Sequence, residues 1–207
     1  MKKNIILFVV AHTDDETIAA GGTIARHSRL GDKVYAMSFT DGVSARSKIS
    51  KKEIIKRNLS SIKASKILGF KWVKKLNFPD NALDSISLIN IIKEIEKEKK
   101  IINPTMIYTH NFFDLNIDHR IVAQATLTAF RPEPKEKMIE LRTFEVPSAT
   151  DFGSPLTKKS FDPNIFISID KYWIKKKKAL MAYRHEIKRA PHARSIDGII
   201  NLAKIRG

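Results

Sequence analysis

The chain contains no cysteine among its 207 residues. Neither a disulfide framework nor a thiolate metal site can therefore form, and any metal ion would have to be held by histidine, aspartate or glutamate. The absence fits a cytoplasmic protein, and we expect that location. A chain of this length is long enough for one sizeable core and too short for two comfortable domains, so we expect a single domain over residues 1–207.

Long apolar runs and acidic residues are also scarce. No stretch is apolar for long enough to cross a bilayer, and we interpret the apolar N-terminal run as a buried strand, since no small-residue cleavage site follows it. Lysine and arginine number 38 against 22 aspartate and glutamate, which gives a net charge of +16. Such an excess is typical of proteins that bind nucleic acid or anionic membranes. Here the lysines are scattered in short groups between apolar residues at helical spacing, which is typical of solvated helix faces.

Short apolar runs alternate with segments of helical period along the first two thirds of the chain. The runs that predict strands are IILFVV at 5–10, VYAMSF at 34–39, KWVKKL around Val73 and TMIYT at 105–109. The segments that predict helices are 16–30, 52–68 and 86–99, and Gly31 and Gly69 stand where C-cap glycines belong. This alternation predicts an α/β fold, a Rossmann-like and mostly parallel sheet with helices on both faces.

The pattern is less regular after residue 130. RPEPKEK, from Arg131, predicts a loop, and RTFEV and NIFISI are candidates for two further strands, the second at 164–169. Residues 172–187 predict a basic amphipathic helix. No internal repeat or low-complexity linker interrupts the chain.

Polar residues gather just after the first four predicted strands, in the groups 12–16, 40–42, 78–84 and 110–119. Ligands of open parallel sheets bind outside the carboxyl ends of the strands. We therefore expect all four groups to lie on one rim of the sheet.

Two of these groups combine histidine with aspartate, in AHTDDE and THNFFDLNIDH. The candidate metal ligands are His12, Asp15, His110, Asp114, Asp118 and His119. A catalytic zinc takes three protein ligands and leaves a position open for water. Two histidines and one carboxylate from two loops would meet that need, and a bound dication would offset the repulsion among the adjacent acids of AHTDDE.

Each group also has an ordinary structural interpretation. Asp14, Asp15 and Glu16 could be first-turn acids that favour the helix macrodipole, and His119 could be a helix-start residue. The two groups together, both at strand carboxyl ends, favour a site. Of the adjacent Asp14 and Asp15, one would then bind the metal and the other would take a proton from water.

The stretch from AHTDDE to the TDG at 40–42 resembles the opening of the LmbE-like, PIG-L-type zinc-dependent N-deacetylases. Their hallmark is A-H-P-D-D-E, then a glycine-containing helix and a T-D-G strand end. Further stretches are similar to later family motifs in the same order, namely ASKILGF, FPDNALD, DLNIDHRIV, FDPNIFISID and KKKALMAYRHE. The resemblance implies an LmbE-like fold and zinc-dependent removal of an acetyl group from an N-acetylated amino sugar or sugar conjugate of the GlcNAc type.

Carried over by position, the family's zinc ligands fall on His12, Asp15 and His119, and its general base falls on Asp14. Thr13 replaces the usual proline of the motif, a change that removes no ligand.

Four more positions follow from the resemblance. Arg57 and Asp80 match positions that face the sugar in relatives, and we assign Asp118 to substrate binding with them. Asn116 stands where many members have a histidine that polarises the carbonyl or stabilises the oxyanion. Asparagine can donate a hydrogen bond but cannot carry a proton, so we assign that catalytic role to Asn116 together with His110.

We therefore predict a small-molecule sugar substrate, whose binding an anionic group such as a nucleotide or phosphate would favour, and no specific nucleic-acid partner. An alternative is a basic nucleic-acid-binding protein without enzymatic activity, which leaves the rim acids unexplained. Another is a Mg²⁺-dependent phosphohydrolase, which would not need the histidines. The sequence leaves open a divalent metal other than zinc and assembly into a homo-oligomer.

Overall fold

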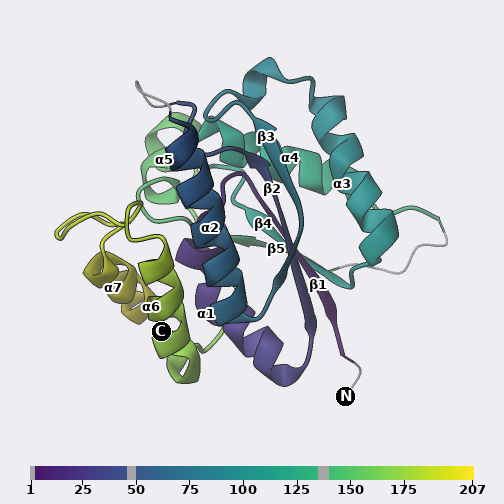
Figure 1. Cartoon of the computed structure of the whole chain (residues 1–207). Coiled ribbons are helices and arrows are strands. Elements are labelled where there is room, and N and C mark those ends of the chain that lie inside the picture. Colours follow the sequence, from purple (N-terminus) through teal and green to yellow (C-terminus); the bar gives the residue numbers. More distant parts are fainter. Residues whose placement is uncertain (1–2, 46–49, 135–139) are drawn as a thin grey trace.

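The computed structural model describes residues 3–45, 50–134 and 140–207. At its centre is a five-stranded sheet of parallel strands in the order β3-β2-β1-β4-β5 (Figure 1). The strands are β1 (Ile5–Val10), β2 (Lys33–Thr40), β3 (Lys71–Phe78), β4 (Met106–His110) and β5 (Glu140–Phe144). The strand order reverses between β1 and β4, and ligands of such sheets bind where the order reverses.

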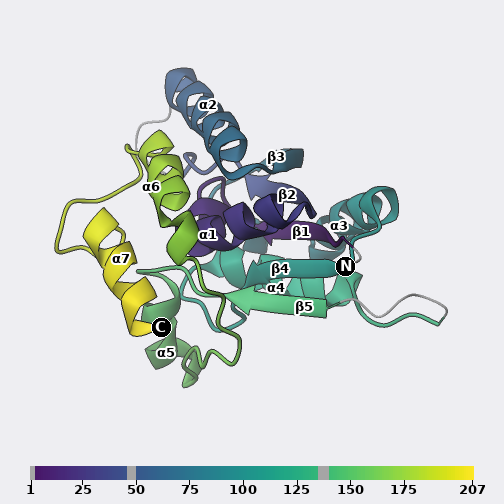
Figure 2. The same ribbon diagram turned by 90° about the horizontal axis from the view of Figure 1, so that it is seen from below.

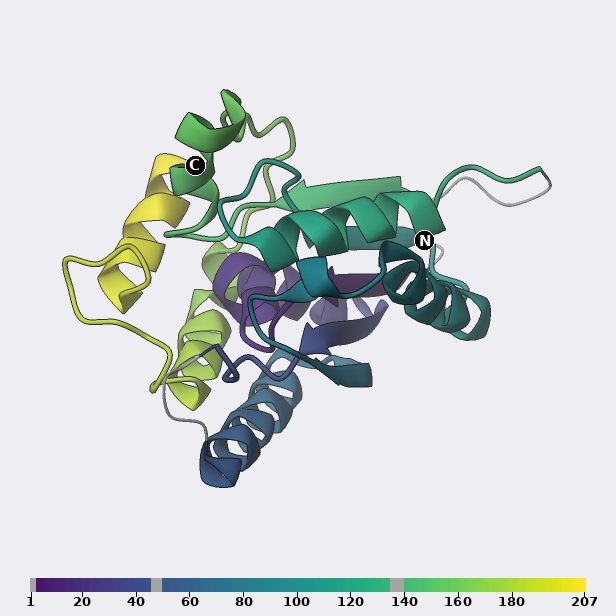
Figure 3. The same ribbon diagram turned by 90° about the horizontal axis from the view of Figure 1, so that it is seen from above.

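Helices cover both faces of this sheet. They are α1 (Asp15–Leu30), α2 (Lys51–Leu68), α3 (Leu88–Ile102), α4 (Ile117–Ala129), α5 (Thr150–Thr157), α6 (Trp173–Ala182) and α7 (Ile196–Ile205), with 3₁₀ turns η1 (Leu83–Ser85) and η2 (Asp170–Tyr172). One face carries α1, α2 and α6. The other carries α3 and α4, which lie side by side in Figure 3. None of the helices in the described ranges combines the length and apolar character that a membrane span requires.

The central strand β1 is apolar on both sides. Phe8 and Val10 pack into the core under α1, while Leu7 and Val9 pack into the core under α3 and α4, and all four are fully buried. A parallel strand with helices over both faces has this continuous apolar character, which is why IILFVV predicts a covered sheet. The predicted Rossmann-like fold is confirmed, and so are the two C-cap glycines, each in the left-handed conformation.

One expectation for the C-terminal part is wrong, and a second is correct only in part. Residues 164–169 form no strand, because the segment packs on α1, where Ile169 lies against Gly22, and does not join the sheet. The helix expected over 172–187 ends at Ala182. RTFEV does overlap the strand β5, whereas part of the loop expected from Arg131 lies outside the described residues. Figure 2 shows β5 pointing towards α5 and α7, so the C-terminal part of the chain gathers beside the carboxyl edge of the sheet.

Candidate active site

The two histidine-containing loops meet at the carboxyl ends of the neighbouring strands β1 and β4. His12 Nδ1 lies 3.1 Å from Asp15 Oδ2, and His119 Nε2 lies 3.3 Å from the same oxygen. The two imidazole nitrogens face each other at 3.3 Å. All three residues, His12, Asp15 and His119, are buried, at 7%, 1% and 0% exposure. Two nitrogens and one oxygen that converge in this way are a donor set that suits zinc.

Carboxylates also contact the second ring nitrogen of each histidine, the one that faces away from the convergent donor atoms. The second ring nitrogen of His12, Nε2, lies 3.0 Å from Asp80 Oδ1 and 3.1 Å from Asp118 Oδ2. On the other histidine, Nδ1 of His119 lies 3.1 Å from Asp114 Oδ2. Histidines that bind metals almost always present their second nitrogen to a carboxylate or carbonyl, which fixes the tautomer and the ring orientation. The residues present therefore fit a divalent metal.

The charges of this cluster support the same conclusion. Although burial opposes it, the nearby carboxylates, Asp15 foremost, raise the pKa of His12 well above its usual value. Burial likewise opposes the charged form of Asp15, yet His119 and His12 hold the pKa of that carboxyl well below its usual range. Carboxylates outnumber imidazoles here, so the cluster favours added positive charge, as a dication would supply.

Asp118 is fully buried and binds backbone. Its oxygens accept hydrogen bonds from the N–H groups of Asn81, at 2.7 Å, and Leu83, at 2.9 Å. The loop that carries Asp80 is thereby anchored to the start of α4, next to His12. The sequence assigned Asp118 to substrate binding, and its contacts in the structure are with this loop and with the His12 ring.

Asp14 is buried and has an unusual backbone conformation, with φ of 143°. A non-glycine residue held in such a region costs about 1–3 kcal/mol and persists only where its surroundings fix it. Its N–H donates to Glu16 Oε2 at 2.9 Å, and its Oδ1 accepts a hydrogen bond from Arg57 at 2.8 Å. Burial raises the pKa of the Asp14 carboxyl to about 6, with Arg57 opposing the shift and Asp15 adding to it. That value is suited to a general base near neutral pH.

Glu16 links Asp14 to the end of α6. It is fully buried, and its Oε1 accepts hydrogen bonds from Thr17 Oγ1 at 2.7 Å and from the hydroxyl of Tyr183 at 3.1 Å. Burial raises the pKa of Glu16 to about 7. Sequence reasoning gave no role to Tyr183, although it lies in KKKALMAYRHE, one of the stretches that carried the family resemblance.

Arg57 reaches the site from α2 and is only 4% exposed. Besides Asp14, it donates to Thr13 Oγ1 at 3.1 Å and pairs with Glu186 Oε1 at 3.0 Å. The guanidinium passes close to Gly42 of the TDG motif, where an added Cβ would lie 2.4 Å from Nε. Thr13, which departs from the family's proline, thus supplies a hydroxyl to Arg57, and the glycine leaves room for the guanidinium.

His110 and Asn116 lie beside the metal-ligand candidates. His110 is fully buried, its Nε2 accepts the N–H of Ala11 at 2.9 Å, and its ring stacks on His119 with centroids 3.9 Å apart. Burial lowers the pKa of His110 well below its usual value, so its imidazole is neutral near pH 7. Asn116 is the N-cap of α4, with Oδ1 accepting the N–H groups of Asp118 and His119 at 2.8 and 3.3 Å. These contacts fix the orientation of His119, and a direct catalytic role for either residue stays a prediction.

Comparison with known proteins gives one family match. The family model described as PIG-L, GlcNAc-PI de-N-acetylase, matches residues 7–130, a range that includes every site residue from His12 to His119. A curated relative in Escherichia coli K12, the uncharacterized deacetylase YaiS, is 29% identical over 188 residues, which are 88% of this chain and 92% of the relative.

Solved structures share the fold. N,N′-diacetylchitobiose deacetylase from Pyrococcus horikoshii superposes with a TM-score of 0.77 at 18% identity, over 98% of this chain and 78% of that one. GalB from Pseudomonas putida KT2440, a 4-carboxy-2-hydroxymuconate hydratase, gives 0.75 at 21% identity, over 100% and 86%. Identities this low show the fold alone, and the hydratase illustrates that one fold supports different chemistries. The family match, which covers most of the chain and the whole histidine and aspartate cluster, decides the class: the chain belongs to the PIG-L family and is a hydrolytic N-deacetylase.

Proposed function

We propose that the protein is a zinc-dependent hydrolase that removes the acetyl group from an N-acetylated amino sugar or sugar conjugate of the GlcNAc type. The observation that carries the proposal is the convergence of His12, Asp15 and His119, with a carboxylate behind each imidazole. The family description names a GlcNAc conjugate, and the relative from Pyrococcus horikoshii acts on an acetylated chitobiose, which supports the substrate class.

Three side chains would hold the metal: His12 through Nδ1, His119 through Nε2 and Asp15 through Oδ2. When bound, a divalent ion supplies polarisation of the amide carbonyl and a lower pKa for water. A second arrangement, His12 with Asp80 and Asp118, also brings three donor atoms together. We favour the first, because it offers two imidazole nitrogens where the second offers one, and because both oxygens of Asp118 already accept backbone hydrogen bonds.

Asp14 is the general base in this proposal. Arg57 holds Oδ1, so we assign the proton of the attacking water to Oδ2. As the water oxygen bonds to the acetyl carbon and the carbon–nitrogen bond breaks, Asp14 passes that proton to the leaving amine. The products are acetate and a free amino sugar. His110 and Asn116 support this step by holding His119 and the start of α4 in place.

Among the substrate-binding candidates we place Asp80 nearest the sugar, since its side chain is 13% exposed beside His12. Arg57 contacts Thr13, Asp14 and Glu186, and we propose that it acts on the substrate mainly by positioning Asp14. The excess of positive charge would favour a substrate with a phosphate or nucleotide group.

The test combines elemental analysis with acetate release from N-acetylglucosamine, N,N′-diacetylchitobiose and UDP-N-acetylglucosamine. We expect about one zinc per chain and acetate from at least one of these substrates. Asp14→Asn should keep the metal and lower turnover at least about 100-fold, while His119→Ala should lose the metal. Asp84→Asn, at an exposed carboxylate near the same rim, is the control. Turnover of Asp14→Asn near that of the control would contradict the base assignment, and zinc without acetate would contradict the substrate class.

A further inference from the structure

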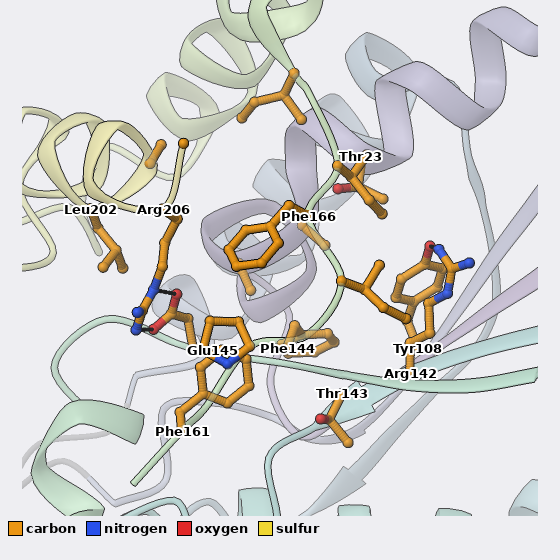
Figure 4. A pocket seen from close by; sticks show the side chains of 18 of the residues that line it. Thr23, Tyr108, Arg142, Thr143, Phe144, Glu145, Phe161, Phe166, Leu202 and Arg206 are labelled. Atoms are coloured by element: carbon orange, nitrogen blue, oxygen red, sulfur yellow. Dashed lines mark hydrogen bonds and ion pairs between the residues drawn. The ribbon is translucent and has the colours of Figure 1, made fainter.

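A cavity of about 960 Å³ lies on the α1 side of the sheet, and none of the metal-ligand candidates lines it (Figure 4). Its walls are α1, the strands β4 and β5, the segment 161–169, α6 and α7. Phe144 separates it from the metal cluster, since its ring packs edge-on against His110 with centroids 5.0 Å apart. Sites for small molecules typically enclose about 300–1,000 Å³, so this cavity is large enough to hold one.

The walls of the cavity are mainly apolar. Figure 4 shows Phe144, Phe161, Phe166 and Leu202 directed around the same space, and Trp173 also lines it. Phe166 is 63% exposed although it belongs to this wall. An apolar ligand body would cover these side chains and remove their surface from water.

Two of the cations that line the cavity already have carboxylate partners. Arg206 donates two hydrogen bonds of 2.8 Å to Glu145. Arg142 pairs with Glu140 at 2.7 Å and donates to the hydroxyl of Tyr108 at 2.9 Å. Neither guanidinium is therefore free to act as the main partner of an anionic ligand.

Lys176 differs from both arginines. Lys176 lines the cavity and is only 4% exposed. Its Nζ donates a hydrogen bond to the carbonyl oxygen of Ala19 at 3.2 Å and lies 6.0 Å from the ring centroid of Trp173. Within the described part of the chain the Lys176 ammonium forms no ion pair. One of its three N–H donors binds the Ala19 carbonyl, and the other two have no carboxylate to bind. Burial lowers the pKa of Lys176 to about 8, with the Glu145 carboxylate opposing the shift without forming an ion pair, and this reflects the cost of keeping the charge without a direct counterion.

We propose that the cavity is a binding site for an aliphatic monocarboxylate, whose carboxylate pairs with Lys176 and whose chain lies along the aromatic wall of Phe144 and Phe161. The ligand supplies the directly contacting counterion that none of the described carboxylates provides. A single charge is favoured because both arginines of the lining are paired within the protein, and its remaining cation, Lys204, is exposed to solvent. Phosphate groups carry more charge and need more donors than one buried ammonium can offer.

Trp173 provides a direct signal of occupancy. The chain has two tryptophans, and the other, Trp72, lies on β3, so a Trp72→Phe background leaves one fluorophore in the cavity. The probes are 12-bromododecanoate, whose bromine quenches a nearby indole, and the neutral 12-bromododecanol. We expect saturable quenching by both, with the carboxylate binding at least tenfold more tightly than the alcohol.

Two methionine variants test the role of the ammonium. Lys176→Met keeps the length of the stem, and it should remove the tenfold preference while leaving the alcohol's affinity unchanged. Lys178→Met removes the same charge from an exposed position on the same helix and should bind both probes as the unsubstituted protein does. Thermal unfolding of both variants confirms that they are folded, and we expect Lys176→Met to be at least as stable as its parent.

Several results would overturn the proposal: no saturable quenching, equal affinity for acid and alcohol, or the same loss in both methionine variants. Because binding is measured without turnover, these results are independent of whether the protein deacetylates a sugar.

Discussion

Asp14 owes its unusual backbone to a chain of hydrogen bonds. Its N–H donates to Glu16, and Glu16 in turn accepts the hydroxyl of Tyr183 from the end of α6. All three residues are buried, so the chain is shielded from competing water. A catalytic carboxylate held in this way is oriented before the substrate arrives, which lowers the cost of reaching the reactive geometry.

Tyr183→Phe tests this series of hydrogen bonds by removing a single oxygen atom. Removing the hydroxyl deprives Glu16 of one hydrogen bond, so Glu16 fixes the position of Asp14 less firmly. A hydrogen bond to a charged group contributes about 1.5–3 kcal/mol to the free energy of the arrangement. We expect kcat to fall about 10-fold or more with metal content unchanged. Tyr172→Phe, at a half-buried tyrosine eleven residues earlier in the sequence, is the matched control. Equal kcat values for the two variants would show that the hydroxyl does not position Asp14.

His27 gives the fold a pH dependence of its own. Its Nδ1 lies 2.8 Å from Asp32 Oδ2, and its Nε2 lies 3.1 Å from the Tyr108 hydroxyl, which also accepts a hydrogen bond from Arg142. A neutral imidazole satisfies both contacts, donating from Nδ1 to the carboxylate and accepting at Nε2 from the hydroxyl. Burial lowers the pKa of His27, with Asp32 opposing the shift.

The sign of the effect on stability follows from this shift. Below about pH 6.5 the unfolded chain binds a proton at this histidine more readily than the folded chain does. The free energy of unfolding should therefore fall as the pH drops from 7 towards 5. In His27→Gln that contribution is absent, so the stability difference between parent and variant in urea titrations should narrow over this range. A difference that stays constant with pH would exclude His27 as the source.

Among the elements, helix α1 has two adjacent glycines, Gly21 and Gly22, against which different segments pack. Gly22 faces Ile169 of the segment 161–169, where an added Cβ would lie 2.7 Å from the Ile169 Cβ. At the preceding residue, Gly21, an added Cβ would lie 3.3 Å from the Cγ of Lys176, a side chain that can adjust, and at an ordinary contact distance of 3.6 Å from Leu68 Cδ1. Two adjacent glycines of one helix thus have different packing, although the sequence shows them as an identical pair.

Gly22→Ala and Gly21→Ala measure that difference. Alanine in a helix interior is favoured over glycine by about 1 kcal/mol, so Gly21→Ala should be neutral or stabilising. In Gly22→Ala the clash with a β-branched side chain fixed close to its own backbone should outweigh that gain and cost about 1–3 kcal/mol. Urea titration reports both values. Equal stability of the two variants would mean that the segment 161–169 moves away from α1 easily.

At the scale of the whole molecule, the sequence predicts the features of the fold and the site that depend on residues close to one another in the chain. Alternating strands and helices place His12 and His119 at one edge, because each follows a strand of a parallel sheet. The contacts of Tyr183 and Glu186 depend instead on how α6 docks, more than a hundred residues from the first loop, and no local pattern encodes that. Asp118 illustrates the same limit, since its backbone partners at Asn81 and Leu83 belong to another loop.

A metal at this cluster would couple the site to the stability of the whole chain. His12 and Asp15 follow β1, and His119 lies in the first turn of α4, so one ion would connect segments 107 residues apart in the sequence. An ion that binds only the folded state stabilises it by RT ln(1 + [M]/Kd), about 4 kcal/mol at a thousandfold excess over Kd. Removal of the metal by a chelator should therefore lower the melting temperature by several degrees, and added zinc should restore it.

His119→Ala should abolish this response, since it removes one of the three ligands. His192→Gln, at an exposed histidine of the C-terminal region, should respond to zinc as the parent does. The comparison does not depend on substrate, so it tests the metal site even if every sugar conjugate fails as a substrate. If zinc stabilised His119→Ala as strongly as the parent, the ion would be bound elsewhere, and the assignment of His12, Asp15 and His119 would have to be abandoned.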